Sequence, residues 1–291
     1  MDKRLIVVLA LIIFVLVSGQ QCKKEEKISF NTTALTMAFV PDAPPSQLVP
    51  GEKYKIYVDI VNNGGFDIAP GDAHFYLSGI GDNLKNVNLY VANAQFLNKK
   101  TALQEGGKER LIFGSEVMAK ELPSAFDFTV RLDACYKYAT LVQTKICIGR
   151  GDGICSVSGE KIKTGDNSAA PVQVTSLTQS IQGNKLYVKF TIENKGKGEV
   201  YLPNLDCTKL QMGDIDEKLK QNQVELAVNT EEGFSCILQG GRKALSGAAE
   251  VRTISCEKIL TTTESHEAPF QILLTYIYRE SLTKPLTILP A

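Results

Sequence analysis

The sequence predicts an all-β protein of two tandem antiparallel β-sandwiches that follow an N-terminal signal or anchor helix. Three observations support this prediction: an apolar run near the N-terminus, many short segments in which apolar and polar residues alternate, and an internal repeat of such segments. The predicted organisation is a signal peptide or a membrane or lipid anchor at 1–22, a first sandwich at 28–164, a linker at 165–171 and a second sandwich at 172–291.

The N-terminal segment has the layout of an export signal. Lys3 and Arg4 precede an uninterrupted apolar run from Leu5 to Val17. This run is shorter than the roughly 20 residues that a membrane-spanning helix needs, which favours a cleaved signal over a permanent anchor. Cys22 offers a third route, because Leu-Val-Ser-Gly shortly before it resembles the lipobox of prokaryotic lipoproteins, although two glutamines intervene. Each route predicts an exported protein.

Both halves of the chain contain segments with a period of two, which bury one face of a strand and expose the other. The clearest are 54–60 and 126–132 in the first half and 186–192 and 270–276 in the second. Shorter strands are expected at 35–40, 74–77, 87–91, 111–113, 224–228 and 286–289, with turns rich in Gly, Pro, Asn and Asp between them. The sequence contains one helical candidate, 214–223.

An internal repeat relates the two halves. Residues 56–64 align with 188–196, which matches Asn62 to Asn194 and Gly64 to Gly196. Residues 128–132 align with 270–274, so the second copy carries a net insertion of ten residues, which we place around 212–236. Between the copies, residues 165–171 are small, polar and rich in turn formers, as in a short linker.

The repeated strand end also carries a resemblance to a known family. The pattern Val-x-Ile-x-Asn-x-Gly at 58–64, echoed at 190–196, resembles the immunoglobulin-like modules of prokaryotic surface proteins, in particular the CARDB type that is named for cell adhesion. In that family an Asn-x-Gly closes an early strand before a polar turn. In addition, residues 39–45, 66–68 and 76–79 resemble the opening of exported proteins of small-genome archaea. These resemblances imply two immunoglobulin-like sandwiches and a surface location, and they imply no activity.

Six cysteines lie within the predicted sandwiches, where an exported protein permits disulfides. They are Cys135, Cys147 and Cys155 in the first copy and Cys207, Cys236 and Cys256 in the second. Because each copy has three, either an odd number of bridges crosses between the copies or each copy keeps a spare thiol. Cys147 faces two candidate partners, Cys135 across a turn at 140–141 or Cys155 around a short loop, and six cysteines allow 15 connectivities.

The residues offer little catalytic chemistry. His74 and His266 lie in different copies, and the chain has no Cys-x-x-Cys, no His-x-x-x-His and no phosphate-binding glycine loop. We therefore expect no enzyme activity, no cofactor and no metal site. Lys plus Arg equals Asp plus Glu at 32 each, so the charge does not favour nucleic acid as a partner. Asn31-Thr32-Thr33 is a sequon for glycosylation.

The loop between Cys147 and Cys155 contains the adhesion tripeptide Arg150-Gly151-Asp152. Its three glycines also suit a tight reversal between strands. The integrins that read this tripeptide belong to animals, whereas the signal and the repeated strands look prokaryotic. A structural turn is therefore favoured, with a binding role for Arg150 and Asp152 as the alternative.

Together these features predict a non-enzymatic extracytoplasmic surface protein that acts as an adhesion or envelope-assembly module. Its expected partners are a protein or glycan at the cell surface, and the membrane through the N-terminus if that segment is uncleaved or lipidated. The alternatives are a solute-binding lipoprotein, which requires a lipid at Cys22 and a pocket between the domains, and an accessory domain of a carbohydrate-active enzyme, whose site would use a pair of carboxylates in a loop cleft.

Overall fold

The structure of the chain, a computed structural model, describes residues 28–149, 155–229, 233–237, 252–261 and 264–291 and shows an all-β protein, as predicted. The predicted signal or anchor lies outside these residues. The first half forms β1 (Leu35–Phe39), β2 (Gln47–Leu48), β3 (Lys53–Asn62), β4 (Ala73–Ser78), β5 (Leu84–Lys85), β6 (Tyr90–Ala92), β7 (Lys108–Ala119) and β8 (Phe126–Ile148). The second half forms β9 (Val172–Gln182), β10 (Lys185–Asn194), β11 (Glu199–Tyr201), α2 (Cys207–Gln211), α3 (Ile215–Lys218), β12 (Glu225–Asn229), β13 (Ser235–Ile237), β14 (Arg252–Ile259) and β15 (His266–Ile288).

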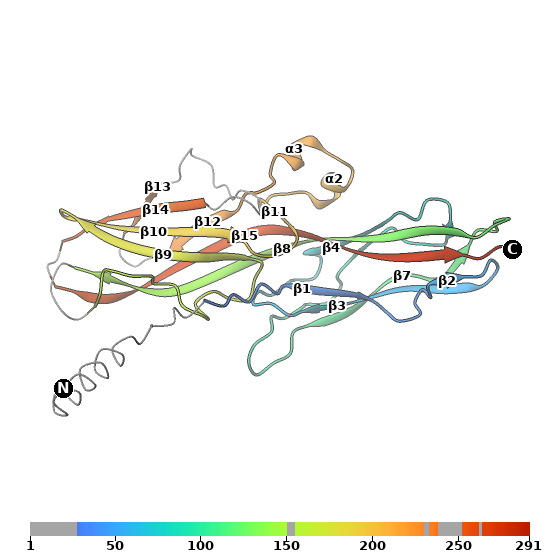
Figure 1. The fold of residues 1–291 in the computed structure, drawn as a ribbon, viewed down its shortest axis with the longest axis horizontal. Helices are drawn as coiled ribbons and strands as arrows, with labels where there is room; N and C mark the ends of the chain where they lie inside the picture. Colours follow the sequence, from blue (N-terminus) through green and yellow to red (C-terminus); the bar gives the residue numbers. More distant parts are fainter. Residues whose placement is uncertain (1–27, 150–154, 230–232, 238–251, 262–263) are drawn as a thin grey trace, which may run out of the picture.

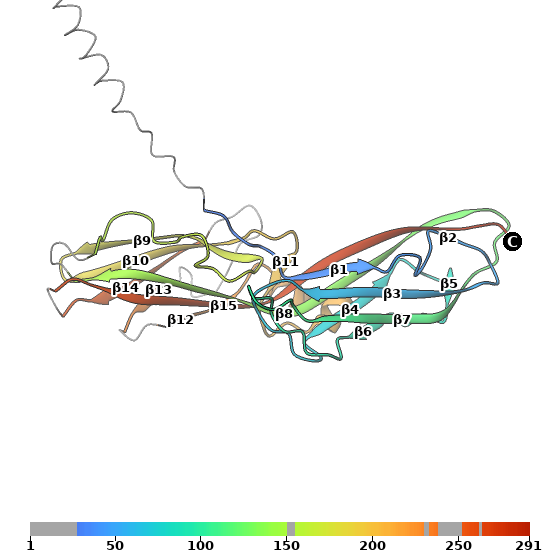
Figure 2. The ribbon, with the colours of Figure 1, turned by 90° about the horizontal axis from the view of Figure 1, so that it is seen from below.

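Two long strands organise the molecule. β8 and β15 each have 23 residues and pair antiparallel along their whole length, from His266 opposite Ile148 to Ile288 opposite Phe126. They form the centre of a seven-stranded sheet and run through an elongated molecule from one end to the other (Figures 1 and 2). Their midpoint, where Lys137 lies opposite Ile277, marks the waist between two lobes.

Each lobe combines the first half of one long strand with the second half of the other. The first lobe contains β1–β7, and β4 pairs with the early part of β8 at residues 131–136. The second lobe contains β9–β14, and β12 pairs with the early part of β15 at residues 271–275. The separate sheets correspond as well, because β1-β3-β7 in the first lobe matches β9-β10-β14 in the second. The lobes are therefore two copies of one arrangement that exchange the ends of their last strands.

This exchange differs from the predicted division into 28–164, 165–171 and 172–291. β8 does not turn at residues 140–141 but continues to Ile148 in the second lobe, and β15 returns to the first lobe. The predicted short linker, residues 165–171, is held in place, since Ser168 N donates to Leu141 O (2.8 Å) and Gly65 N donates to Ala169 O (2.7 Å). Neither half of the chain can complete its own sheet alone.

Four tyrosines fill the waist. Tyr136 lies opposite Tyr278 and Tyr138 lies opposite Tyr276 on the two long strands, and all four side chains are buried. Neighbouring ring centroids are 5.8 to 6.5 Å apart, in edge-to-face and tilted arrangements that aromatic pairs prefer. Burial raises the pKa of Tyr278 to about 12, although its hydroxyl also accepts a hydrogen bond from Gly198 N (2.6 Å), so the phenol is neutral at ordinary pH. We call these four residues the tyrosine cluster.

The two Asn-x-Gly turns pack against the tyrosine cluster in the same way. Asn62 Oδ1 accepts from Gly64 N (3.2 Å) while Asn62 Nδ2 donates to the carbonyl four residues on, at 2.7 Å. Asn194 repeats both bonds, to Gly196 N (3.1 Å) and to the carbonyl of residue 198 (2.8 Å). A Cβ on Gly64 would collide with the Tyr138 hydroxyl, and one on Gly196 would collide with the Tyr278 hydroxyl. The repeat in the sequence therefore encodes two equivalent contacts at the waist.

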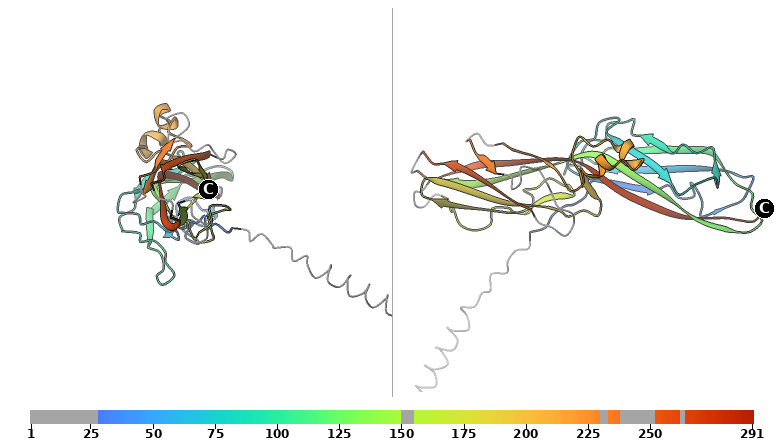
Figure 3. Two further views of the ribbon diagram at one scale, coloured as in Figure 1. Left: turned by 90° about the vertical axis from the view of Figure 1, so that its left-hand side faces the viewer. Right: turned by 90° about the horizontal axis from the view of Figure 1, so that it is seen from above.

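Several predicted elements differ in extent from the observed ones. The run at 286–289 is the end of β15 rather than a separate strand, and the strand expected at 87–91 is found at Tyr90–Ala92. The helix expected at 214–223 is limited to α3, which begins after its N-cap Asp214 and ends at Lys218. Together with α2 and the residues between the two helices, it forms a segment, 207–219, that protrudes at the waist (Figures 1 and 3). We call this segment the helical excursion. Of the two helices, α3 lies within the region around 212–236 where the second copy is longer, whereas α2 directly precedes that region.

The close contact at the waist predicts that Gly64→Ala and Gly196→Ala each lower the free energy of unfolding by about 1 to 3 kcal/mol, because the added methyl group overpacks the tyrosine cluster. Asn63→Ala and Lys195→Ala change the middle residue of the same turns and serve as controls, with an expected effect of about 0.5 kcal/mol or less. Urea unfolding followed by circular dichroism measures all four. Equal midpoints for glycine variants and controls would contradict the proposed contact.

Glu280 gives the fold a pH dependence. It accepts a hydrogen bond from the Tyr136 hydroxyl (2.7 Å), and burial raises its pKa although that hydrogen bond acts in the opposite direction. The folded chain thus holds this proton more tightly than the unfolded chain, whose glutamate pKa is about 4.3. The free energy of unfolding should therefore fall as the pH rises from about 4.3 through the raised pKa.

Glu280→Gln should remove this fall, so that the variant loses less stability between pH 4 and pH 8 than the wild type does. Urea midpoints across that range provide the measurement. Glu116→Gln, at an exposed carboxylate, should retain the wild-type slope. If Glu280→Gln also retained it, the carboxyl would not be the group responsible.

Candidate functional site

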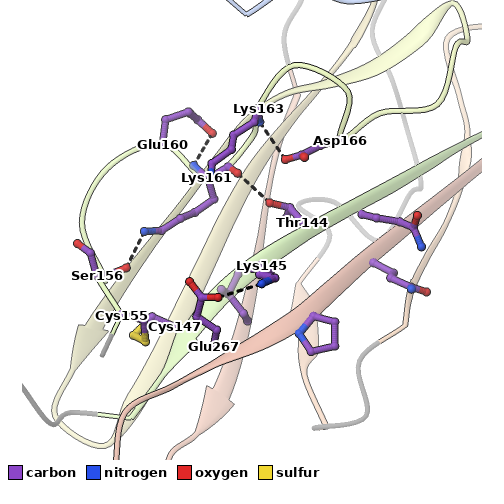
Figure 4. A pocket seen from close by; sticks show the side chains of 14 residues that line it. Thr144, Lys145, Cys147, Cys155, Ser156, Glu160, Lys161, Lys163, Asp166 and Glu267 are labelled. Carbon is purple, nitrogen blue, oxygen red and sulfur yellow. Dashed lines mark hydrogen bonds and ion pairs between the residues drawn. A yellow bond between two sulfur atoms is a disulfide. The ribbon is translucent and has the colours of Figure 1, made fainter. Parts of the chain in front are cut away.

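A polar groove lies on the second lobe, the lobe away from the C-terminus in Figure 1, and Figure 4 shows the side chains that line it. Its volume is about 620 Å³. The floor consists of side chains that point outward from paired positions of β8 and β15: Gln143 with Gln271, Lys145 with Pro269, and Cys147 with Glu267. Lys145 Nζ and a Glu267 oxygen form an exposed ion pair at 3.1 Å. Strand alternation places these polar groups together because every second residue faces outward.

The segment 155–166 forms one wall of the groove and is fastened to β8. Gln143 N donates to Asp166 O (2.9 Å), and Thr144 Oγ1 donates to Lys161 O (2.8 Å). Within the wall, Lys161 Nζ donates to the carbonyls of Ser156 (2.6 Å) and of residue 158 (2.8 Å). The wall is therefore ordered by its own hydrogen bonds, which prepares the groove for a ligand without a large ordering cost.

The two carboxylates of the wall brace the backbone. Glu160 Oε1 accepts from the backbone N–H groups of residues 161, 162 and 177, and its Oε2 accepts from Ser176 Oγ at 2.7 Å. Asp166 Oδ2 accepts from Lys163 N (2.9 Å). Since residue 177 lies on β9, Glu160 also covers part of the outer edge of that strand, which protects it from pairing with another chain. These carboxylates hold the wall in place rather than standing free for acid–base chemistry.

The groove is suited to hydrogen bonding. Its floor and wall present the amides of Gln143 and Gln271 and the ammonium groups of Lys145 and Lys163, while the ammonium group of Lys161 is bonded within the wall. Both cysteines at its end are joined in a disulfide, and no histidine occurs among its described lining residues. Such a surface can bind a polar chain, either a glycan or a peptide, through several directed hydrogen bonds.

All six predicted disulfide cysteines are paired. Cys147 is joined to Cys155 at the end of the groove, with Cα atoms 5.6 Å apart, rather than to Cys135. The bond between Cys135 and Cys207 links β8 to α2, so one bridge connects the two copies. The remaining pair, Cys236–Cys256, joins directly opposite positions of β13 and β14. The tripeptide Arg150-Gly151-Asp152 between Cys147 and Cys155 lies outside the described residues, as does Cys22.

The other predicted residues are placed away from the groove floor. Asn31 is exposed just before β1. His74 on β4 forms a hydrogen bond with the Tyr90 hydroxyl (2.9 Å), and its pKa is lowered mainly by burial; His266 begins β15. Within the described residues, no three His, Cys, Asp or Glu side chains are arranged to hold a metal ion. None of the described helices is long and apolar enough to cross a membrane.

Sequence reasoning missed the groove because it ended the first sandwich before the linker and considered a turn at residues 140–141, so it did not expect one long strand there. The even-numbered residues from Val130 through Ile146 are all buried except the half-buried Thr144, and this continuous period of two could have shown one long strand with Gln143 and Lys145 on its outer face. It also missed the exposed apolar tips of the helical excursion, Met212, Ile215 and Leu219, which are 70 to 75% exposed. Nothing in the alternation of neighbouring strands predicts these.

Comparisons with known proteins add little. No protein-family model and no curated protein matches the chain. Among solved structures, it is similar to the secreted serine protease VesC from Vibrio cholerae, with 11% sequence identity and a TM-score of 0.20. That alignment covers 84% of this chain and 50% of the protease chain, so the chain spans about half the length of that neighbour.

The disulfides should differ in their contribution to stability. Cys135 and Cys207 are 72 residues apart in sequence, whereas Cys147 and Cys155 are 8 apart. The loop-entropy model assigns about 4.4 kcal/mol to the first bridge and about 2.5 kcal/mol to the second. The double variant C135A/C207A should therefore be less stable than C147A/C155A by about 2 kcal/mol in urea unfolding. If the two double variants lost the same free energy of unfolding, the length of the closed loop would not determine how much each disulfide stabilises the protein.

Proposed function

We propose that this chain is a non-enzymatic extracytoplasmic binding protein, an adhesion or envelope-assembly module that holds a glycan or a protein segment in the groove of its second lobe. The observation that carries this proposal is the groove itself, a preformed polar surface of paired amide and charged side chains on a rigid two-stranded floor. A binding function requires a fixed arrangement of donors and acceptors, and the groove provides one.

The location outside the cytoplasm is supported by the cysteines and by the N-terminal pattern. Three disulfides use all six cysteines of the predicted sandwiches, and such bonds persist in oxidising compartments. The basic and apolar residues at 1–17 have the layout of an export signal. Whether the segment is cleaved, lipidated at Cys22 or retained determines whether the protein is released or held at the membrane.

The two-lobed body suits a surface protein that holds its binding site on a rigid support. The exchanged strands and the Cys135–Cys207 bridge connect the lobes through backbone hydrogen bonds and a covalent bond, so that they form one stiff unit. We infer that each lobe is a variant of the immunoglobulin-like sandwich, because the Asn-x-Gly turn that resembles the CARDB type recurs in the same contact in both. In this view the body is a rigid support and the groove is its functional site.

An accessory domain of a carbohydrate-active enzyme is a second candidate, because a groove lined by amides and ammonium groups also fits a polysaccharide. The two candidates differ in what accompanies binding. An accessory domain should bind the isolated polysaccharide on which its enzyme acts. An adhesion module should instead attach the protein to whole cells or isolated envelopes.

The double variant K145A/E267A tests the groove. The pair is exposed, so its removal should change the free energy of unfolding by about 1 kcal/mol or less. Hydrogen bonds from charged groups to a ligand contribute about 1.5 to 3 kcal/mol, so binding should weaken about tenfold or more. The probes are a glycan array and envelopes isolated from the producing cells.

A matched control exists in the first lobe, where Lys53 and Glu116 form an ion pair of similar length, 3.0 Å, and similar exposure. K53A/E116A should bind like the wild type. If K145A/E267A bound as tightly as K53A/E116A and the wild type, the groove would not be the binding site. Reproducible turnover of a glycan or peptide substrate would overturn the non-enzymatic part of the proposal.

A further inference from the structure

We propose that Asn31 carries an N-linked glycan whose first sugar occupies the small pocket beside it, at the waist of the molecule. The proposal goes beyond the binding function above and does not depend on it. Asn31 belongs to the one Asn-x-Ser/Thr sequence in the whole chain, so a single glycan is predicted. The arguments come from how the folded chain holds its backbone, its side chain and the space around it.

The backbone at Asn31 is fixed. Its carbonyl oxygen accepts hydrogen bonds from Ala170 N (3.0 Å) and from Gln173 Nε2 (3.3 Å). Two residues earlier, Ser29 N donates to Thr164 Oγ1 (3.2 Å). All three partners belong to the segment 165–171 that joins the two halves of the chain or lie within two residues of it. The acceptor site is therefore presented at one position on the surface.

The side chain of Asn31 is held in an orientation that favours reaction at its nitrogen. Its Oδ1 accepts hydrogen bonds from Thr33 N (3.1 Å) and from the Thr33 hydroxyl (2.7 Å), while its Nδ2 forms no hydrogen bond with the described residues. Two donors on the amide oxygen withdraw electron density and make a proton on Nδ2 easier to remove. The requirement for Thr at the third position of the sequon is met here by a direct contact.

The reaction partner is a sugar that a lipid carries as a diphosphate ester. A bond forms between Nδ2 of Asn31 and the anomeric carbon of the sugar, while the bond from that carbon to the diphosphate oxygen breaks. The lipid diphosphate leaves with the electron pair, and one Nδ2 proton passes to a base of the transferase. No oxidant or reductant is needed.

The pocket beside Asn31 has room for the first sugar. Its volume is about 430 Å³, within the usual range for sites that hold a small organic ring. Phe30 provides partly buried apolar surface, while Lys163, Thr164 and Asn167 provide hydrogen-bonding groups. Lys163 also lines the groove of the second lobe, so a glycan on Asn31 would lie against the outer side of the groove wall.

The experiment uses the full chain secreted by a host that demonstrably glycosylates a co-expressed reporter sequon. Intact mass and glycopeptide mass spectrometry should show one glycan, on Asn31, in the wild type and in Thr33→Ser. Asn31→Gln and Thr33→Ala should lose it, whereas Thr32→Ala, at the neighbouring hydroxyl, should keep it. An unmodified Asn31 beside a modified reporter would overturn the proposal.

The position of the first sugar has its own measurement. An amine-reactive reagent should modify Lys163 several-fold more slowly in the glycosylated protein than in Asn31→Gln, because the sugar covers its ammonium group. Lys53 in the first lobe, which is 60% exposed, should react equally in both and serves as the internal control. Equal labelling of Lys163 in the two forms would exclude the sugar from the pocket even if Asn31 is glycosylated.

Discussion

The antiparallel pairing of β8 with β15 is the constraint on which the rest of the structure depends. Each strand is long enough to serve both lobes, so the sheet of each lobe is completed by the other copy of the repeat. The tyrosine cluster sits at the midpoint of this pairing, where both Asn-x-Gly turns meet it. A change at the waist therefore affects both lobes at once, and stability is expected to be cooperative over the whole described body.

The same pairing creates the candidate site. Where β8 passes into the second lobe, its outward side chains lie beside those of β15 and form the groove floor, and the segment after β8 folds back to make the wall. The Cys147–Cys155 disulfide then closes the chain reversal that connects floor and wall. Binding residues on paired strands are placed more rigidly than residues on loops, which suits a preformed site.

The proposed glycan and the groove share a boundary. Asn31 lies at the waist, just before β1. The segment that holds its backbone follows the groove wall in the chain, and Lys163 lines both the groove and the pocket beside Asn31. A sugar at this position would restrict access to the groove from one side and leave the outward face of β8 and β15 open. The second lobe thus has a groove with a fixed polar floor, and a glycan on Asn31 would enlarge one side of that groove.

The sequence by itself determined the all-β class, the repeat and the turn chemistry, because alternation and Asn-x-Gly turns act over a few residues. It placed strands at 54–60 and 186–192, but it left open whether a bridge between the copies or a spare thiol in each explains the odd cysteine count, and the Cys135–Cys207 bond settles this. Only the tertiary structure decided that β8 continues past Thr140, that its end belongs to the other lobe, and that Gln143 and Lys145 face Gln271 and Pro269. Strand pairing between residues more than a hundred positions apart depends on the packing of the whole core, and no local pattern encodes it.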